Sequence, residues 1–223
     1  MPSPTNGVPV CEKNQSGVTT VCLILASSSP RRQELLRSVG IPFKVVPSRV
    51  IETVLPGEKP EAHVMRLAAA KAEEVAARFP GYWVLGADTT VIIDGHILGK
   101  PRDKVEAAEM LSLLQNRVHR VFTGYMIMNT AFPEKQRMRA VGSWVRIRPL
   151  NSREIHAYVE TGEPLDKAGS YAIQGLGVGI VEKVFGSYTN VVGLPLCEVI
   201  HDLKELGVFG FLAGYGDDSS RLR

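Results

Sequence analysis

The sequence has little cysteine and no long apolar run, and each absence excludes a class of protein. It contains three cysteines, Cys11, Cys22 and Cys197, without a CxxC pair or zinc-finger spacing. We therefore expect no disulfide framework, and a reducing compartment such as the cytoplasm fits. No apolar run approaches the ~20 residues that a membrane-spanning helix needs. We expect no membrane partner.

A strong net charge and a targeting signal are also missing. The 26 basic and 23 acidic residues leave a net charge of +3, spread evenly along the chain. Such a balance does not favour binding to nucleic acid. Residues 1–20 lack an early basic cluster and an apolar segment, so they do not resemble a signal peptide. With 44% hydrophobic residues in 223, the chain can bury a core of its own.

Strand-like and helix-like segments alternate along the chain, which predicts a mixed α/β fold. We expect residues 1–20 to be a flexible extension, 21–212 a single domain and 213–223 a flexible tail. The predicted strands are 21–26, 43–47, 83–86, 90–93, 97–98, 118–129 and 137–150. The predicted helices are 30–39, one from residue 60, 103–115, 152–161 and 195–207.

The turn from Ser27 to Arg32 joins the first strand to the first helix. Ser29 suits the N-cap and Pro30 the first helical position. Backbone amides at a helix N-terminus favour an anion, and Arg31 and Arg32 add forked donors. The turn therefore predicts a phosphate site, with a solvated helix end and surface arginines as the alternative. The Walker pattern GxxxxGK[ST] is absent from the sequence.

Two carboxylates could serve catalysis. Asp88 directly follows an apolar strand, at the strand end where open α/β sheets place ligands. It could bind a metal or act as the general base for a water nucleophile. Alternatively, it is a turn residue that bonds its own backbone. Glu52, in a loop, is either a surface acid or the second carboxylate of a divalent-cation site.

Two lysines and one amide complete the candidate set. Lys71 falls on the apolar stripe of its predicted helix, four residues after Leu67. It either snorkels to solvent or points its ammonium into a polar cleft to hold phosphate oxygens. Lys100 lies in a loop between glycine and proline. In the small-residue stretch 167–175, the Gln174 amide could read the edge of a pyrimidine.

Four segments taken together indicate a protein family more specifically than any one of them does. LASSSPRRQELL at 25–36, GADT at 86–89, LGKP at 98–101 and AIQG at 172–175 resemble motifs of the Maf family of nucleotide pyrophosphatases. The match runs in order over about residues 21–209. The resemblance implies an elongated mixed sheet with two lobes around a deep cleft, similar to the inosine-triphosphate pyrophosphatase-like fold. It also implies a homodimer that hydrolyses a nucleoside triphosphate to the monophosphate and pyrophosphate with a divalent cation, Mg or Mn.

The resemblance also assigns roles to residues. It implies that Asp88 accepts a proton, and that substrate choice depends on Arg31, Thr89 and Gln174. That trio resembles the branch that acts on dTTP and UTP, rather than the branch that acts on 7-methyl-GTP. Many members carry an Asp-Glu pair where this chain has isoleucine before Glu52, so only Glu52 and Asp88 remain as metal ligands.

These expectations combine into one hypothesis with named rivals. The groups expected to hold the triphosphate are Ser28, Arg31, Arg32, Lys71 and Lys100. The substrate could be a normal or a modified pyrimidine triphosphate. An inosine-triphosphate-type enzyme would prefer deaminated purine nucleotides. A nucleotide-sensing regulator of septum formation would bind a nucleotide without releasing pyrophosphate.

Overall fold

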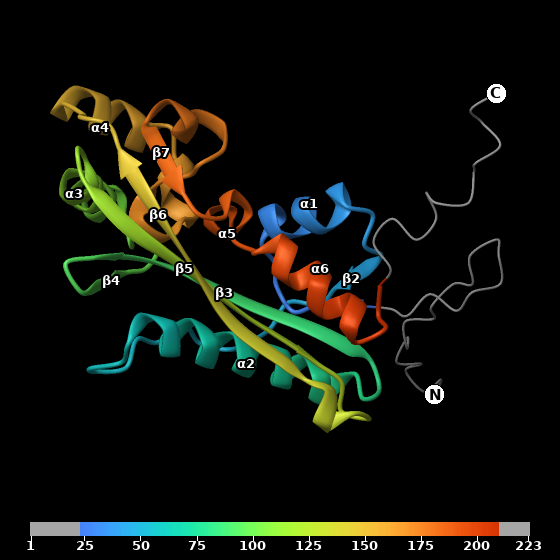
Figure 1. The fold of residues 1–223 in the computed structure, drawn as a ribbon. Helices are drawn as coiled ribbons and strands as arrows, with labels where there is room; N and C mark the ends of the chain where they lie inside the picture. Colours follow the sequence, from blue (N-terminus) through green and yellow to red (C-terminus); the bar gives the residue numbers. More distant parts are fainter. Residues whose placement is uncertain (1–22, 210–223) are drawn as a thin grey trace, which may run out of the picture.

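The computed structural model describes residues 23–209, and both predicted flexible ends, 1–20 and 213–223, lie outside this range. A seven-stranded mixed sheet forms its centre, in the order β2-β1-β3-β5-β6-β7, with β4 paired to β3 (Figure 1). Its strands are β1 Leu23–Leu25, β2 Phe43–Val45, β3 Trp83–Ile93, β4 His96–Leu98, β5 Val118–Met128, β6 Arg137–Ile147 and β7 Val181–Phe185. β1 pairs in parallel with β2 and β3, and the other pairs are antiparallel. The mixed α/β class is confirmed.

Helices cover both faces of the sheet (Figure 1). They are α1 Pro30–Ser38, α2 Pro60–Arg78, α3 Lys104–Leu114, α4 Ser152–Glu160, α5 Tyr188–Val192 and α6 Leu196–Glu205. Four short 3₁₀ helices are η1 Pro133–Lys135, η2 Glu163–Asp166, η3 Ala168–Ser170 and η4 Gly175–Gly179. Among residues 23–209, no helix combines the length and the apolar character that crossing a bilayer requires.

Two separate cores lie on the face opposite α2. Residues of α1, α5 and α6 pack with Leu85 and Tyr125 at one end of the sheet. Residues of α3 and α4 pack with Val91 and Val145 at the other end. α2 covers the remaining face and packs on Val84 and Met126. The two ends correspond to the two lobes that the resemblance implies.

β3 differs from its prediction in a way that matters for function. The two predicted strands 83–86 and 90–93 form one strand of eleven residues, because β5 pairs with it from Val84 to Ile92 without a break. Asp88 therefore lies in the middle of a strand, and the prediction that it follows a strand end is wrong. Ser29 is the N-cap residue of α1 but makes no side-chain capping hydrogen bond. β7 and α5 were not predicted.

The other edge of β3 is open in its centre. β1 pairs with β3 only at residues 83–85, and β4 pairs only at residues 91–93. Within the described chain, residues 86–90 thus have no strand partner on that side. Because successive side chains of a strand point to opposite faces, groups from both faces can reach this open edge.

Candidate active site

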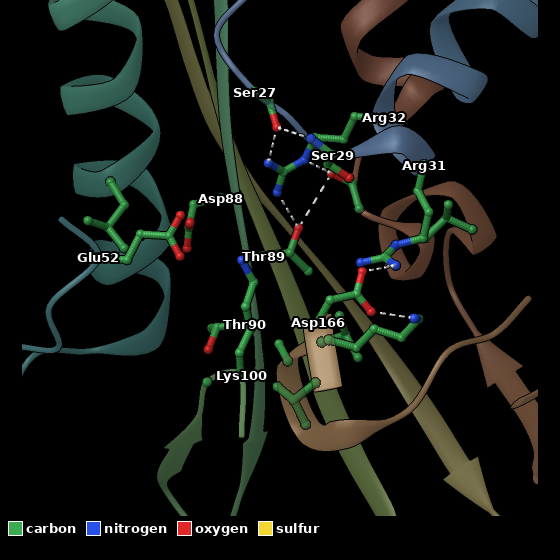
Figure 2. Close-up of a pocket in the computed structure, with 18 of the residues that line it drawn as sticks. Ser27, Ser29, Arg31, Arg32, Glu52, Asp88, Thr89, Thr90, Lys100 and Asp166 are labelled. Carbon is green, nitrogen blue, oxygen red and sulfur yellow. Dashed lines mark hydrogen bonds and ion pairs between the residues drawn. The ribbon is translucent and has the colours of Figure 1, made fainter. Parts of the chain in front are cut away.

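A cavity of about 540 Å³ lies at the open edge of β3. This volume is within the range of about 300–1,000 Å³ typical of small-ligand sites. Its lining includes every residue that the sequence singled out: Ser28, Arg31, Arg32, Glu52, Lys71, Asp88, Thr89, Lys100 and Gln174. Asp88 faces α2 and Thr89 faces α1, so the cavity reaches around the edge and has two sides (Figure 2).

The side next to α2 carries a lysine between two carboxylates. Lys71 Nζ lies 2.7 Å from Asp88 Oδ1 and 2.5 Å from Glu52 Oε1. Lys71 is 6% exposed and Asp88 5%, whereas the Glu52 side chain is 45% exposed. Lys71 therefore points into the cavity and does not snorkel. Asp88 bonds this ammonium and lies within a strand, so the alternative of a turn aspartate is excluded.

Electrostatics favours an ionised Glu52 on this side. Burial alone would raise the pKa of Glu52, but the charge and hydrogen bond of Lys71 outweigh it. Lys100 and Arg32 contribute in the same direction, so the pKa of Glu52 falls below its ordinary value. At neutral pH Glu52 therefore presents a negative charge at the cavity beside the positive charge of Lys71.

The donor set on this side fits a divalent cation that binds together with phosphate. Mg²⁺ is usually held by one or two carboxylates, with substrate phosphates and water as the other ligands. Glu52 and Asp88 meet at one ammonium nitrogen and could supply those carboxylates. Among residues 23–209, no cluster of three or more His, Cys, Asp or Glu residues could hold a metal on protein ligands alone, so the cation would also need ligands from phosphate and water.

On the α1 side, Arg32 connects three parts of the fold. Its Nε donates to Gly193 O at 2.8 Å, Nη1 to Ser27 Oγ at 3.0 Å and Nη2 to Thr89 Oγ1 at 3.0 Å. Burial lowers the pKa of Arg32, and the negative charges of two nearby carboxylates, first Asp88, offset part of that effect. Arg32 thus fixes the shape of the α1 side and brings a buried positive charge to it.

The sequence matches the family described as Maf-like protein over residues 22–206, more than half of the chain. This chain belongs to the Maf-like protein family. A dTTP/UTP pyrophosphatase of Syntrophotalea carbinolica is 49% identical over 86% of this chain and 87% of its own length. Another protein with that name, from Geobacter metallireducens, is 51% identical over 83% of this chain and 96% of its own length.

The similarity to one solved structure is much weaker. A nucleoside-triphosphatase from Mycobacterium abscessus, titled a dITP/XTP pyrophosphatase, is 16% identical, with a TM-score of 0.36. It covers 58% of this chain and 75% of that chain. A likeness at this level carries no argument about fold or function, so the family assignment depends on the sequence matches.

The remaining predicted groups of this Maf-like chain line the mouth of the cavity. Arg31 Nη1 lies 3.4 Å from Asp166 Oδ2, which connects α1 to η2 (Figure 2). Ser28 and Lys100 are exposed, and Gln174 is half-buried. These side chains are therefore accessible to a ligand, and their expected contacts with substrate stay predictions.

Sequence reasoning missed the residues that hold the loop carrying Gln174. The Glu163 carboxylate accepts hydrogen bonds from the Tyr158 hydroxyl at 2.7 Å, from Leu176 N at 3.0 Å and from Gly177 N at 2.9 Å. The Tyr158 hydroxyl in turn accepts from Ala172 N at 3.2 Å. A Cβ on Gly177 would lie 2.1 Å from Ala172 O, so only glycine fits this fold of the loop. In the sequence, the glycine-rich run 175–179 was the one feature that indicated this tightly packed loop.

Proposed function

We propose that this chain hydrolyses dTTP and UTP, and modified pyrimidine triphosphates, to the monophosphate and pyrophosphate. The observation that carries the proposal is that all four motif segments meet at one cavity. Relatives about half identical to this chain over most of their length bear the name dTTP/UTP pyrophosphatase, which supports the same substrate class.

The α2 side of the cavity is the place for the hydrolytic step. Asp88 Oδ1 bonds Lys71, so Oδ2 can accept the proton of a water molecule that attacks the α-phosphorus. The P–O bond to the β-phosphate breaks, and pyrophosphate leaves with its electron pair. Lys71 and Lys100, with Arg31 and Arg32, neutralise the charge of the triphosphate.

Glu52 and Asp88 would hold the divalent cation, Mg or Mn. A bound cation of this kind neutralises charge on phosphate oxygens as a Lewis acid. The α1 side would choose the substrate, through Arg31, Thr89 and Gln174. These three come from α1, β3 and the loop before η4, so the choice of base depends on the packing of distant segments.

The proposal includes a cytoplasmic homodimer without nucleic-acid or membrane partners. Two large aromatic side chains on neighbouring strands, Trp144 and Phe185, are 48% and 55% exposed, and a second copy could cover them. The net charge of +3 gives little attraction for nucleic acid. Light scattering coupled to size exclusion measures the mass in solution directly.

The test is pyrophosphate release from a panel of canonical, methylated and deaminated triphosphates, with Mg²⁺, Mn²⁺ or no metal. Selective turnover of dTTP and UTP supports the proposal. Preference for 7-methyl-GTP or ITP would keep the enzyme class and overturn the substrate choice. Nucleotide binding by folded protein without any pyrophosphate release would indicate a nucleotide-sensing regulator, such as one of septum formation.

A further inference from the structure

His63 brings a buried imidazole to the α2 side of the cavity. It lies near the start of α2 and lines the cavity with Leu67 and Lys71, which follow on the same side of the helix. The residue is only 4% exposed. Its Nε2 bonds no group among residues 23–209 and is not enclosed by them, so this nitrogen opens to the cavity.

Contacts with Glu58 and Arg66 determine which ring nitrogen carries the proton. His63 Nδ1 lies 3.0 Å from Glu58 Oε2 and 3.3 Å from Arg66 Nη2. A guanidinium NH₂ group has two protons, and those of Arg66 Nη2 go to Glu58 Oε2 at 2.7 Å and to Thr53 O at 2.9 Å. Nδ1 therefore receives no proton from Arg66 and donates its own to Glu58.

Glu58 thus holds the ring in one orientation. Hydrogen bonds from Arg66 lower the pKa of Glu58, so this carboxylate is ionised at neutral pH. Its side chain is only 10% exposed and bonds both His63 and Arg66. With Nδ1 committed to Glu58, Nε2 can accept from a donor or, in an imidazolium, donate to an anion. The position of the ring in the cavity decides between the two.

The packing of α2 on the sheet shows where its first turn lies. A Cβ on Gly86 would meet Ala68 O, and a Cβ on Gly124, which pairs with Asp88, would meet Val64 O. Positions further along β3 thus face positions earlier in α2, so the two elements run antiparallel. The first turn of α2 therefore lies beyond the aspartate, in the direction in which β3 runs.

A triphosphate with its α-phosphorus at Asp88 would extend toward this turn. The groups proposed to read the base lie on the α1 side, so the β- and γ-phosphates remain on the α2 side. His63 and Lys71 are eight residues apart, about 12 Å along the helix axis, and helical side chains lean toward the N-terminus. The Lys71 ammonium is therefore followed by the His63 imidazole, near the positive end of the helix dipole.

We propose that His63 donates a hydrogen bond from Nε2 to the γ-phosphate and thereby distinguishes a triphosphate from a diphosphate. The proposal rests on the proposed function, because it takes the α-phosphorus to lie at Asp88. In the complex the ring is an imidazolium, with one proton toward Glu58 and one toward the phosphate, and both negative charges stabilise it. Glu58 is the positioning residue, since it holds the ring without contact with the substrate.

Two non-hydrolysable nucleotides isolate the γ-phosphate. α,β-Methylene-UTP and α,β-methylene-UDP differ only in that group, so the ratio of their Kd values, measured by calorimetry with Mg²⁺, reports its contribution. His63→Asn keeps a donor at the δ position for Glu58 and lacks Nε2. It should bind the triphosphate analogue about tenfold more weakly and the diphosphate analogue as the wild type does. His63→Gln places its amide at the ε position and should keep most of the wild-type ratio.

A purely structural role of His63 predicts the opposite order of the two variants, because only asparagine retains the contact with Glu58. Equal weakening of both analogues in His63→Asn, which would place the ring at the nucleoside, overturns the proposal, as does an unchanged ratio. His201→Asn is the matched control: His201 is exposed on α6 and does not line the cavity, so both Kd values should stay at the wild-type level.

The unmodified protein gives an independent test if the variants do not fold. With ¹⁵N-labelled histidine, α,β-methylene-UTP should move the Nε2 signal of one of the five histidines to that of an imidazolium, and α,β-methylene-UDP should not. Absence of a histidine that responds to the third phosphate overturns the proposal. A protein that neither hydrolyses UTP nor binds either analogue overturns the proposed function itself. UTP turnover with a wild-type ratio in His63→Asn overturns only the role of His63.

Discussion

At the residue scale, the unusual feature is an aspartate in the middle of a buried strand. Aspartate is disfavoured in strands, and Asp88 is 5% exposed. Two circumstances make the position tolerable: the Lys71 ammonium lies 2.7 Å away, and the edge of β3 is open beside it. A residue that violates local preference and faces a cavity is a candidate for chemistry.

Asp88→Asn tests the role of this carboxylate. An amide cannot accept the proton of the attacking water, so kcat is expected to fall by about 10²–10⁴. Nucleotide affinity is expected to be unchanged or tighter, because the variant removes a negative charge from an anion site. Asp94→Asn, in the exposed hairpin turn, is the control. Wild-type turnover by Asp88→Asn would remove Asp88 from the mechanism.

The sequence predicted which residues line the cavity but not how they are connected. The motifs named Arg32 and Thr89, and both line the cavity. The bond from Arg32 to Gly193 joins residues 161 positions apart, and that from Thr89 to Thr123 joins residues 34 apart. Such pairings depend on strand register and loop packing, which local sequence patterns do not contain.

At the element scale, hydrogen bonds to Glu58 fix the start of α2. The N-cap residue of this helix, Lys59, makes no side-chain capping bond. Arg66 donates to both carboxylate oxygens of Glu58, at 2.6 and 2.7 Å, and also to Thr53 O at 2.9 Å. These bonds join α2 to the loop that carries Glu52. The hydrogen bonds from Arg66, followed by that from His63, lower the pKa of Glu58 to about 2.

This shift predicts a pH-dependent contribution to stability. Because the folded-state pKa is depressed, the contribution is complete above the ordinary value of 4.5 and is lost as the pH falls through about 2. Glu58→Gln is expected to lower the free energy of unfolding by about 1–3 kcal/mol at pH 7. Denaturant unfolding at pH 7, 5, 4 and 3 should show the difference from wild type shrinking below pH 4.5.

Glu61→Gln is the control for that series. Glu61 lies in the first turn of the same helix, but its ion pair with Arg120 is 3.8 Å long and partly exposed. We expect little change in stability at any pH. A Glu58→Gln deficit that is the same at pH 7 and pH 3 would contradict an ionised Glu58.

The loop that carries Gln174 allows a separate prediction. Burial alone would raise the pKa of Glu163, but the Leu176 amide, the Tyr158 hydroxyl and the Gly177 amide hold it below its ordinary value. Glu163→Gln weakens these bonds and should raise KM for UTP by up to about tenfold with little change in kcat. Glu182→Gln, an exposed pair with Arg146, is the control. A fall in kcat at unchanged KM would instead implicate Glu163 in the chemical step.

Elements with a long apolar pattern were predicted correctly. Elements whose bounds depend on strand pairing, and elements too short to show a period, were not. α2 begins at Pro60, as its apolar stripe and proline indicate. β3 is continuous through the GADT segment because β5 pairs with it along its length. β7 and α5 are five residues each, too short to give a clear period.

At the scale of the whole molecule, α2 lies directly against the sheet at two glycines. A Cβ on Gly86 would be 2.3 Å from Ala68 O, and one on Gly124 would be 2.5 Å from Val64 O. This close approach brings Lys71 of α2 to Asp88 of β3. The sequence could not show it, because the glycines of β3 and β5 and the residues of α2 that they meet lie far apart in the chain.

Gly124→Ala should therefore separate α2 from the sheet. The new methyl group has no flexible neighbour to displace, and overpacking of this kind costs about 1–3 kcal/mol or more. Thermal unfolding should show a Tm lower by several degrees, with reduced turnover. Gly179→Ala, with nothing within 4 Å of the new Cβ, should leave Tm unchanged. Equal Tm values for the two variants would contradict this packing.

The central claim is that water attacks the α-phosphorus of a pyrimidine triphosphate in this cavity. Hydrolysis of UTP in ¹⁸O-labelled water, with mass analysis of the products, tests it most directly. We predict one ¹⁸O atom in UMP and none in pyrophosphate. Label in pyrophosphate would place the attack on the β-phosphorus, and UDP with labelled phosphate would place it on the γ-phosphorus. Either result would contradict the account.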